Sequence, residues 1–330
     1  MPTKTITYDN LETFTRESWD KKLINRVELA SAMTKFLFSR RMVGNHAQRM
    51  NIPLRYQRAD GGSVTKFGPT GLQGRTYYEK ETSTVGWVEP VFQSGNIYIT
   101  EQEEDLNHGE AAIISMLDEK YQYLEDEMTY MFRNATNGFW SDGSAANAWL
   151  GIPYWVPDDY GAGTVANVDR TDSTYQYWAG ANATNRDAAT TLATWNWGKM
   201  ITLLNNINGD GTKERTPDIG ICTKAVYEHI WKQTEPEMRL PITTSLAAKL
   251  GLEHINFQGI PITWDVDCPA SHLYFLKSAD WQFRVLTRAN MRVKPWFDSE
   301  QDHARLKSVI IGGQVTCLNP AGQGCFTALA

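Results

Sequence analysis

The clearest pattern in the sequence is a stripe of apolar residues between Glu110 and Asn134. The apolar positions follow one another mostly in steps of three and four: Ile113, Met116, Leu117, Tyr121, Leu124, Met128, Met131, Phe132 and Ala135. Such spacing places them on one face of an amphipathic α-helix. Four acidic residues precede the stripe and suit the positive end of a helix dipole, and Asn137-Gly138 follows it as a stop signal. At about 1.5 Å per residue the predicted helix is roughly 35–40 Å long, which fits a flat, extended subunit.

Two strand-like segments, 51–60 and 85–100, flank a long stretch with few aliphatic residues. The first segment ends at Gly61-Gly62, and the stretch between the two contains Gly68-Pro69 and further glycines. Together they predict a long hairpin whose tip cannot bury itself. A hairpin without its own core needs a neighbour to lie on.

The segments on either side of these elements are predicted to be mostly irregular. Residues 1–10 are polar, and this arm leads into a helix, because apolar residues then recur at helical spacing. These residues are Trp19, Leu23, Ile24, Val27, Phe36 and Leu37. Residues 141–190 are rich in Gly, Ala, Asn, Asp and Thr and predict a loop with one packed aromatic turn, at 151–157.

From residue 195 onwards, short helices and strands alternate. One helix is predicted over 195–207, with Trp197, Met200, Ile201, Leu204 and Ile207 facing inward. A second helix, capped by Thr223, reaches about residue 234 with Val226, Ile230 and Trp231 facing inward. Strands are predicted at 217–222, within 255–267, at 273–276 and 281–286 as a hairpin, and at 309–318 ahead of a Pro/Gly tail.

Composition narrows the function classes. Hydrophobic residues make up 42% of the 330 residues and charged residues 21%, which is typical of a folded globular protein. The net charge of −6 argues against a protein that grips nucleic acid through its phosphates, although DNA can still lie against it. The first nine residues show no secretory signal, and no stretch approaches the roughly 18 apolar residues of a membrane span. The 12 Trp, 14 Tyr and 12 Phe leave open a large core or extensive contact between subunits.

No motif for catalysis or metal binding is found. The sequence lacks the short signatures of zinc proteases, serine hydrolases and phosphate-binding loops, and its six His are scattered. The four cysteines are Cys222, Cys268, Cys317 and Cys325. They form no Cys-x-x-Cys pair, so we predict buried free thiols in a reducing compartment rather than a zinc site. Asn206 to Gly211 imitates the start of a calcium loop, but Pro217 stands where that loop needs Glu. We therefore predict no metal, no cofactor and no enzymatic activity.

The order of these parts resembles the major capsid proteins of tailed double-stranded DNA phages, which have the Hong Kong 97 type fold. The resemblance covers nearly the whole chain and rests on architecture, because the family has no invariant motif. It implies an α+β fold with an N-terminal arm and helix (1–50), an extended loop hairpin (51–100), a peripheral domain (101–217), an axial domain (218–295), and a return strand with the C-terminal tail (296–330). Within the peripheral domain, 110–134 is the spine helix and 141–190 the Gly/Asn-rich loop. Residues 273–281 resemble the family's late axial hairpin.

A structural function follows from the resemblance. Subunits would self-assemble as hexamers and pentamers into the icosahedral head that encloses the phage genome. The chain would then be a virion component that is assembled in the host cytoplasm. Implied partners are further copies of the chain, a separate scaffolding protein or none, and a portal. A decoration protein is left open, no membrane is involved, and the double-stranded DNA is enclosed without sequence-specific binding.

The residues expected at contacts between subunits are aromatic or charged. They are Trp19, Lys66, Phe67, Arg75, Tyr77, Tyr78, Lys80, Trp87, Glu103, Glu104, Glu125 and Trp155. Glu125 and its two acidic neighbours point to different sides of the helix, so they are expected to be solvated or to pair with basic residues of another subunit. Some relatives crosslink a loop lysine to an Asn. Lys66 and Lys80 lie in or beside this loop, but no partner Asn or catalytic Glu is marked, so no crosslink is expected.

Three other interpretations are considered. An encapsulin-like cellular shell protein of the same fold would have a shorter extended loop and assemble without a scaffold. A phage tail or surface-adhesion protein would lack the single long helix. An enzyme without a recognised motif would gather His and carboxylates in a deep pocket.

Overall fold

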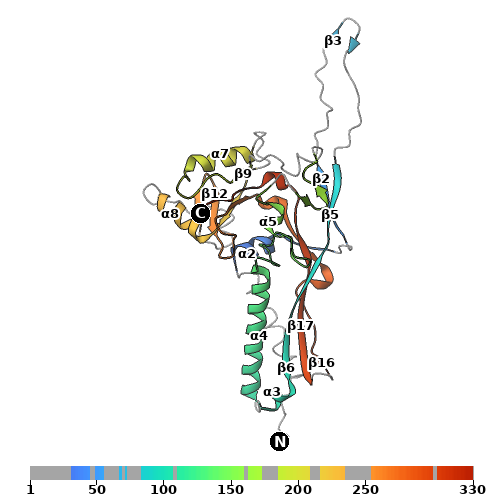
Figure 1. Cartoon of the computed structure of the whole chain (residues 1–330). Coiled ribbons are helices and arrows are strands. Elements are labelled where there is room, and N and C mark those ends of the chain that lie inside the picture. Colours follow the sequence, from blue (N-terminus) through green and yellow to red (C-terminus); the bar gives the residue numbers. More distant parts are fainter. Residues whose placement is uncertain are drawn as a thin grey trace.

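Two six-stranded sheets form the framework of the molecule (Figure 1). The computed structural model describes residues 31–44, 49–55, 67–68, 71–72, 83–106, 110–159, 163–172, 185–208, 216–234, 254–299 and 303–329. The predicted helical positions from Trp19 to Val27 lie outside these residues. Phe36 and Leu37 are buried in α2 (Ala32–Ser39), which begins at a capping box between Ser31 and Thr34.

The first sheet is centred on β17 (Ala304–Cys317), a strand of 14 residues. Along one side, β17 pairs antiparallel with the whole of β6 (Val91–Thr100). Along its other side it pairs in turn with β14 (Trp281–Leu286), β15 (Arg292–Val293) and β16 (Phe297–Ser299), while β14 also pairs with β1 (Arg41–Gly44). The predicted strand at 309–318 is confirmed, but it begins earlier because β6 and β16 continue the ladder to Ala304.

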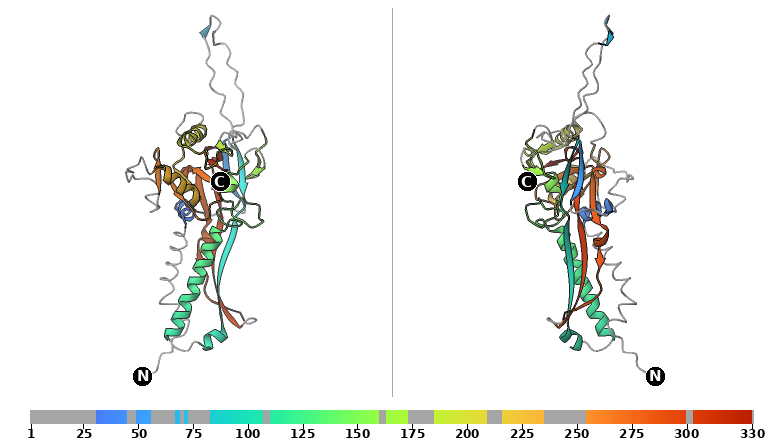
Figure 2. Two further views of the ribbon diagram at one scale, coloured as in Figure 1. Left: turned by 60° about the vertical axis from the view of Figure 1, so that its left-hand side comes forward. Right: turned by 90° about the vertical axis from the view of Figure 1, so that its right-hand side faces the viewer.

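The predicted long helix is confirmed as α4 (Glu110–Arg133), which packs lengthwise on β6 (Figure 1). Its buried side chains are Met116, Leu117, Tyr121, Leu124, Met128 and Phe132. Gly95 in β6 permits this approach, because a Cβ there would lie 2.6 Å from Leu124 Cδ1 and 2.8 Å from Met128 Sδ. Ala135, the last member of the predicted stripe, lies beyond the helix and is exposed. We call α4 together with β6, β16 and β17 the blade, since these elements extend away from the rest of the fold (Figure 2).

The second sheet has the strand order β11-β12-β10-β13-β18-β9. These strands are β11 (Ile255–Phe257), β12 (Ile260–Trp264), β10 (Ile219–Cys222), β13 (Leu273–Leu276), β18 (Gly324–Phe326) and β9 (Arg186–Asp187). The helices α7 (Trp197–Ile207) and α8 (Lys224–Thr234) pack their apolar sides on this sheet in a core of their own. The described residues thus form two cores: a larger one to which both sheets contribute, and a smaller one between the second sheet and the helices α7 and α8.

Several details of these two helices differ from the prediction. The first begins at Trp197, because the side chain of Asn196 caps it by accepting from Lys199 N at 2.9 Å. Ile201 is 37% exposed, and Leu203 takes the expected inward place. Trp231 is 46% exposed on α8, and the buried hydroxyl of Thr223 accepts no capping hydrogen bond.

The predicted hairpin over 273–286 is wrong. β13 pairs with β10 and β18 in the second sheet, whereas β14 pairs with β1 and β17 in the first. Between them, η3 (Ser278–Asp280) turns the chain from one sheet to the other. Asp218 holds this crossing, since its carboxylate accepts hydrogen bonds from Ser278 N at 2.7 Å and from the Ser278 hydroxyl. A hairpin lies instead at 255–264, where one strand was predicted, and Gln258-Gly259 form its turn with φ of 50° and 86°.

Two segments that were predicted as irregular contribute to the core. The aromatic turn is confirmed as α5 (Ile152–Trp155), but Trp149 and Trp155 are among the largest fully buried side chains. β7 (Thr164–Val165) and β8 (Val168–Asp169) form a small hairpin, and β9 joins the second sheet. In the C-terminal tail, η5 (Pro320–Gly322) and β18 are buried, and β18 pairs with β13.

The predicted long hairpin is present at its base. β2 (Met50–Arg55) pairs antiparallel with β5 (Ser83–Val88). Two short strands, β3 (Phe67–Gly68) and β4 (Gly71–Leu72), pair with each other far from both sheets (Figure 1). The rest of 56–82 lies outside the described residues.

Candidate functional site: the exposed faces of the blade

The side of α4 that points away from β6 carries tyrosines and carboxylates. Its members, which we call the helix face, are Glu119, Tyr123, Asp126, Glu127 and Tyr130. Tyr123 and Tyr130 are 61% and 65% exposed. The Tyr123 hydroxyl donates to Glu119 Oε1 at 3.0 Å, which raises the pKa of Tyr123. Asp126 and Glu127 have no ion-pair partner among the described residues, so this face presents unneutralised negative charge beside two aromatic rings.

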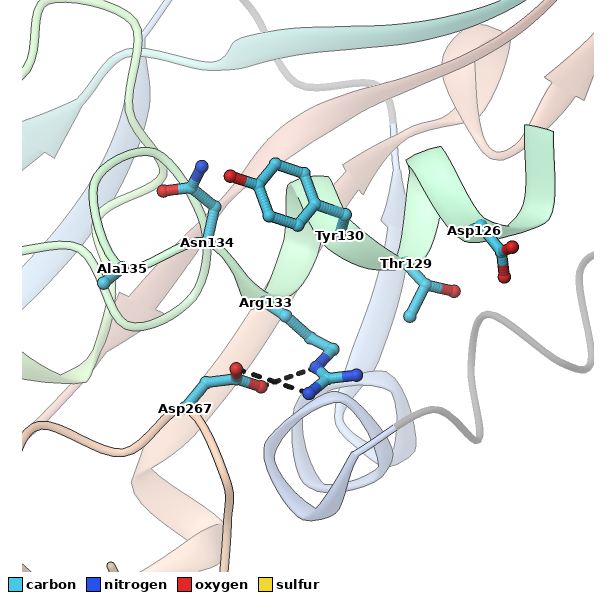
Figure 3. A pocket seen from close by; sticks show the side chains of 7 residues that line it. All are labelled: Asp126, Thr129, Tyr130, Arg133, Asn134, Ala135 and Asp267. Atoms are coloured by element: carbon cyan, nitrogen blue, oxygen red, sulfur yellow. Dashed lines mark hydrogen bonds and ion pairs between the residues drawn. The ribbon is translucent and has the colours of Figure 1, made fainter. Parts of the chain in front are cut away.

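A groove of about 520 Å³ lies at the end of the helix face (Figure 3). Its lining residues are Asp126, Thr129, Tyr130, Arg133, Asn134, Ala135 and Asp267. Arg133 Nε and Nη2 donate to the Asp267 carboxylate at 2.5 and 3.3 Å, and this pairing raises the pKa of Arg133. The pair ties the end of α4 to the turn after β12 and neutralises both groups, which leaves Asp126 as the free charge of the groove.

The opposite side of the blade is apolar. Lys307, Val309 and Ile311 of β17 are buried, so the alternate residues Leu306 and Ile310 point to the other face. Leu306 pairs with Tyr98 on one side and Phe297 on the other, which places these three side chains in one row. Phe92 lies over Gly312, where a Cβ would come within 2.6 Å of its ring.

We call this surface the sheet face: Phe92, Tyr98, Phe297, Leu306 and Ile310. Phe92 is 63% exposed, Tyr98 42% and Phe297 69%. Ser94, Asn96 and Ser308 interrupt the apolar set on the same face. Isolated exposed apolar residues are ordinary, but several large ones on one sheet surface are typical of an interaction site.

Basic residues gather at the edge of the blade formed by η4 (Thr287–Ala289) and β15. Arg288, Arg292 and Lys294, which we call the basic edge, are exposed and have no ion-pair partner among the described residues. The backbone of this edge is fixed, because β15 pairs with β17 and Lys294 N donates to Ser308 O at 2.8 Å. β15 lies on the side of β17 away from β6, so the basic edge and α4 lie on opposite sides of the central strands.

A buried lysine fixes α4 on the sheet. Lys307 is 1% exposed, and its ammonium group donates a hydrogen bond to the hydroxyl of Tyr121 on α4. The same ammonium lies 5.1 Å from the centre of the Tyr121 ring and 5.8 Å from that of Trp296. A buried cation needs such partners, so the pair also fixes the register of the helix on β17.

The acidic residues that precede α4 belong to a short helix of their own, α3 (Glu101–Leu106). Glu103 accepts from Lys120 Nζ at 2.9 Å and from Thr100 N at 3.2 Å. The Lys120 hydrogen bond is the main reason why the pKa of Glu103 is lowered. Glu103 therefore anchors α3 to α4 within the chain.

The other predicted contact residues are placed as follows. Trp87 is half-buried, with the guanidinium of Arg49 4.1 Å from the centre of its ring, and Glu125 is half-buried on α4. Trp155 was predicted wrongly, because it is 0% exposed and its Nε1 donates to Val315 O at 3.2 Å. Phe67 is in β3 and Glu104 in α3, but their side chains lie outside the description. Outside the described residues altogether are Trp19, Lys66, Arg75, Tyr77, Tyr78 and Lys80.

Sequence reasoning missed the exposed aromatic residues of the blade. Tyr123 and Tyr130 had a signal, since they are seven residues apart on the side of the predicted helix opposite the apolar stripe. Phe92 and Tyr98 also had one, because they occupy the outward positions of the alternating strand. Phe297 had no signal, since β16 has only three residues and its exposure depends on pairing with β17.

The four cysteines are buried and free, as predicted. Burial raises the pKa of Cys222, Cys268 and Cys317 well above its usual value, and that of Cys325 to about 11. These thiols are inert at neutral pH. In the described part of the chain, no group of three metal-binding side chains occurs and no helix is long and apolar enough to cross a membrane.

The sequence matches no protein-family model and no curated protein, but solved structures resemble the chain. The cyanophage A-1(L) capsid asymmetric unit is 14% identical with a TM-score of 0.62, and the match covers 92% of this chain and 93% of that one. The capsid of the native GTA particle is 11% identical with a TM-score of 0.55, over 89% and 90% of the two chains. The capsid of Myoviridae phage XM1 is 12% identical with a TM-score of 0.52, over 91% and 92%. The chain therefore has the Hong Kong 97 type capsid fold, a mixed helix-and-sheet fold, along nearly its whole length.

Proposed function

We propose that this chain is the major capsid protein of a tailed double-stranded DNA phage, a structural shell subunit without enzymatic activity. The observation that carries the proposal is the agreement in fold with capsid structures over about nine tenths of both chains. The exposed faces of the blade support it, because a subunit of a shell must offer more than one surface to its neighbours.

We assign one proposed domain to each of the two sheets. The blade would be the peripheral domain with α4 as its spine helix, and the second sheet with α7 and α8 would be the axial domain. The boundaries differ from those inferred from sequence, since β14 and β15 pair in the sheet of the blade and β18 in the other sheet. The base formed by β2 and β5 would carry the extended loop, which lies over an adjacent subunit together with the N-terminal arm.

Assembly would draw its affinity from many modest contacts that close into a shell. The sheet face supplies apolar area for these contacts, at about 1.5–3 kcal/mol for each large side chain that becomes fully buried. Among the predicted contact residues, Trp87, Glu103, Glu104 and Glu125 stay candidates, as do those of the arm and loop. Trp155 is withdrawn.

The proposed partners are further copies of the chain in hexamers and pentamers, a separate scaffolding protein and a portal, with a decoration protein left open. The genome would be enclosed without sequence-specific contacts. The net charge of −6 fits this role, because an anionic wall does not hold packaged DNA. The particle would be built in the host cytoplasm.

The test is negative-stain microscopy of the purified protein, expressed alone and then with its neighbouring genes. Uniform round shells or capsomer rings are expected in at least one condition. Shells from the protein alone would mean that no scaffold is required and would favour the encapsulin-like alternative. Fibres or trimeric spikes would favour a tail or adhesion protein, although the single long α4 speaks against that class. A persistent monomer in both conditions contradicts the proposal.

A further inference from the structure

We propose that neighbouring copies of the chain dock by placing the basic edge of one blade against the helix face of the next. The inference rests on the proposed function and names the two surfaces that meet. The occupant of the helix face is thus a second copy of this chain, and the recognising groups are Arg288, Arg292 and Lys294.

The charge on the helix face lacks an ion-pair partner among the residues that the structure describes. The exposed Asp126 and Glu127 make no ion pair among the described residues, and Glu119 makes a hydrogen bond to a tyrosine. Lys120 is already engaged by Glu103, and Arg133 by Asp267. The nearby cations on α4 are therefore used, and the face keeps its negative potential for a partner.

The tyrosines indicate what kind of partner fits. An aromatic ring beside a carboxylate binds a guanidinium or ammonium group through both its π-face and the charge. Tyr123 is held toward Glu119 by its hydroxyl, and Tyr130 borders the groove that also contains Asp126 (Figure 3). These groups favour the binding of a long basic side chain over that of an apolar side chain.

The basic edge offers that chemistry on a firm support. Arg292 belongs to β15, and the backbone of Lys294 is bonded to β17, so both cations project from the sheet and not from a loose loop. Arg288, in η4, adds a third exposed cation. None of the three has an ion pair among the described residues.

The two surfaces of one copy lie on different faces of the sheet. α4 packs on one face, whereas Arg292 pairs with Ile310, whose side chain points to the other face. Two different patches on opposite sides of one subunit make a head-to-tail contact, which closes into a ring when the rotation between copies permits. A capsomer needs a contact of this type.

Charge reversal tests the contact. One variant carries Asp126→Lys with Glu127→Lys, a second carries Arg292→Glu with Lys294→Glu, and a third combines all four. All four side chains are exposed, so the fold is expected to survive, and circular dichroism checks it. A control, Lys199→Glu with Lys232→Glu, makes the same charge change as the second variant on α7 and α8, where both lysines are exposed.

Assembly is followed by light scattering and microscopy under the condition in which the wild type forms shells or rings. We expect each single-face variant to assemble about tenfold or more slowly, since complementary charge accelerates association by roughly 10- to 1,000-fold. The combined variant should regain most of the rate because its charges are again complementary. The control should assemble like the wild type, and added salt should slow the wild type toward the rate of the variants.

Disulfide trapping reads the contact directly. Chains with both Asp126→Cys and Arg292→Cys, or both Glu127→Cys and Lys294→Cys, should form a ladder of dimers, trimers and higher species under mild oxidation. Chains with one of these changes should not, and the native thiols are buried. If the wild type assembles while single-face variants assemble equally fast and no ladder forms, the inference fails and the proposed function stands. If the wild type forms neither shells nor rings, both fail.

Discussion

The two faces of the blade share one core but differ in chemistry. The helix face is anionic, with exposed tyrosines, whereas the sheet face is mainly apolar, with two phenylalanines more than half exposed and with Arg292 of the basic edge paired beside Ile310. Apolar burial is proportional to area and is not screened by salt, while charge acts over about 8 Å at physiological ionic strength and sets orientation and rate. The comparison shows that one subunit can use an apolar surface to set the strength of binding and a charged surface to set its orientation and rate.

The largest expected effect comes from a substitution that pushes α4, which carries the helix face, away from β6, which carries part of the sheet face. Gly95→Val places atoms where Leu124 and Met128 now lie, so α4 cannot rest on β6. We expect the free energy of unfolding to fall by about 1–3 kcal/mol, and assembly to fail because both faces move. Ser94→Val is the control, since it introduces the same side chain at the preceding position of the strand, where the side chain is exposed. Urea denaturation measures both variants, and equal midpoints for the two would contradict the packing argument.

The next effect distinguishes the faces by what each controls. Phe297→Ser removes apolar area from the sheet face, and we expect the critical concentration for assembly to rise about tenfold or more, with little dependence on salt. Tyr123→Ser on the helix face should change the rate and its salt dependence more than the critical concentration. Both residues are exposed, so neither change should alter the melting temperature. Sedimentation at several protein and salt concentrations measures this, and identical behaviour of the two variants would remove the distinction.

The parts that sequence could predict are those whose pattern is local. α4 was found because nine apolar positions keep helical spacing over a long segment, and the base of the hairpin because glycine-rich turns flank alternating residues. β13 and β14 were misjudged because both alternate correctly, while nothing local in 277–280 shows that Asp218 holds a crossing between two sheets. Trp155 was misjudged because tryptophan is favoured both in cores and at interfaces. Part of the helix face could be inferred, because it lies on the side of the helix opposite the predicted apolar stripe. The sheet face could not, because it depends on which strands pair with β17.

A smaller effect concerns the buried lysine between the faces. Tyr121→Phe deletes the hydroxyl that accepts from Lys307, and we expect a loss of about 1–3 kcal/mol of stability, because the buried ammonium loses a hydrogen-bond partner. Lys307→Met removes the cation at similar volume and should cost less, since no buried charge is left. Thermal unfolding of the two variants checks the order. A larger loss for Lys307→Met would show that the cation itself stabilises the blade.

The smallest effect concerns a histidine outside the two faces. The Nε2 atom of His272 lies 3.0 Å from Asp158 Oδ1, and the pair links the segment after α5 to the turn before β13. Burial alone lowers the pKa of His272, but the hydrogen bonds to Asp158 and to Ala270 O outweigh it and the pKa is raised. The His272 hydrogen bond is the main cause that lowers the pKa of Asp158.

The sign of this effect follows from the two directions. A raised histidine pKa contributes stability that is complete below about pH 6.5 and is lost as the pH rises through the folded value. A lowered aspartate pKa contributes stability above about pH 3.9 that is lost as the pH falls through the folded value. The pair is therefore strongest between these limits.

We expect Asp158→Asn to remove no more than about 1 kcal/mol near pH 5.5 and less at pH 8, because the side chain of Asp158 is 64% exposed and screened by solvent. Burial raises the pKa of the neighbouring Tyr274, Cys268 and Cys325, so these groups stay neutral in this range. Unfolding midpoints of the wild type and variant at the two pH values measure the difference, and a difference that grew toward pH 8 would mean that His272 is not the titrating group.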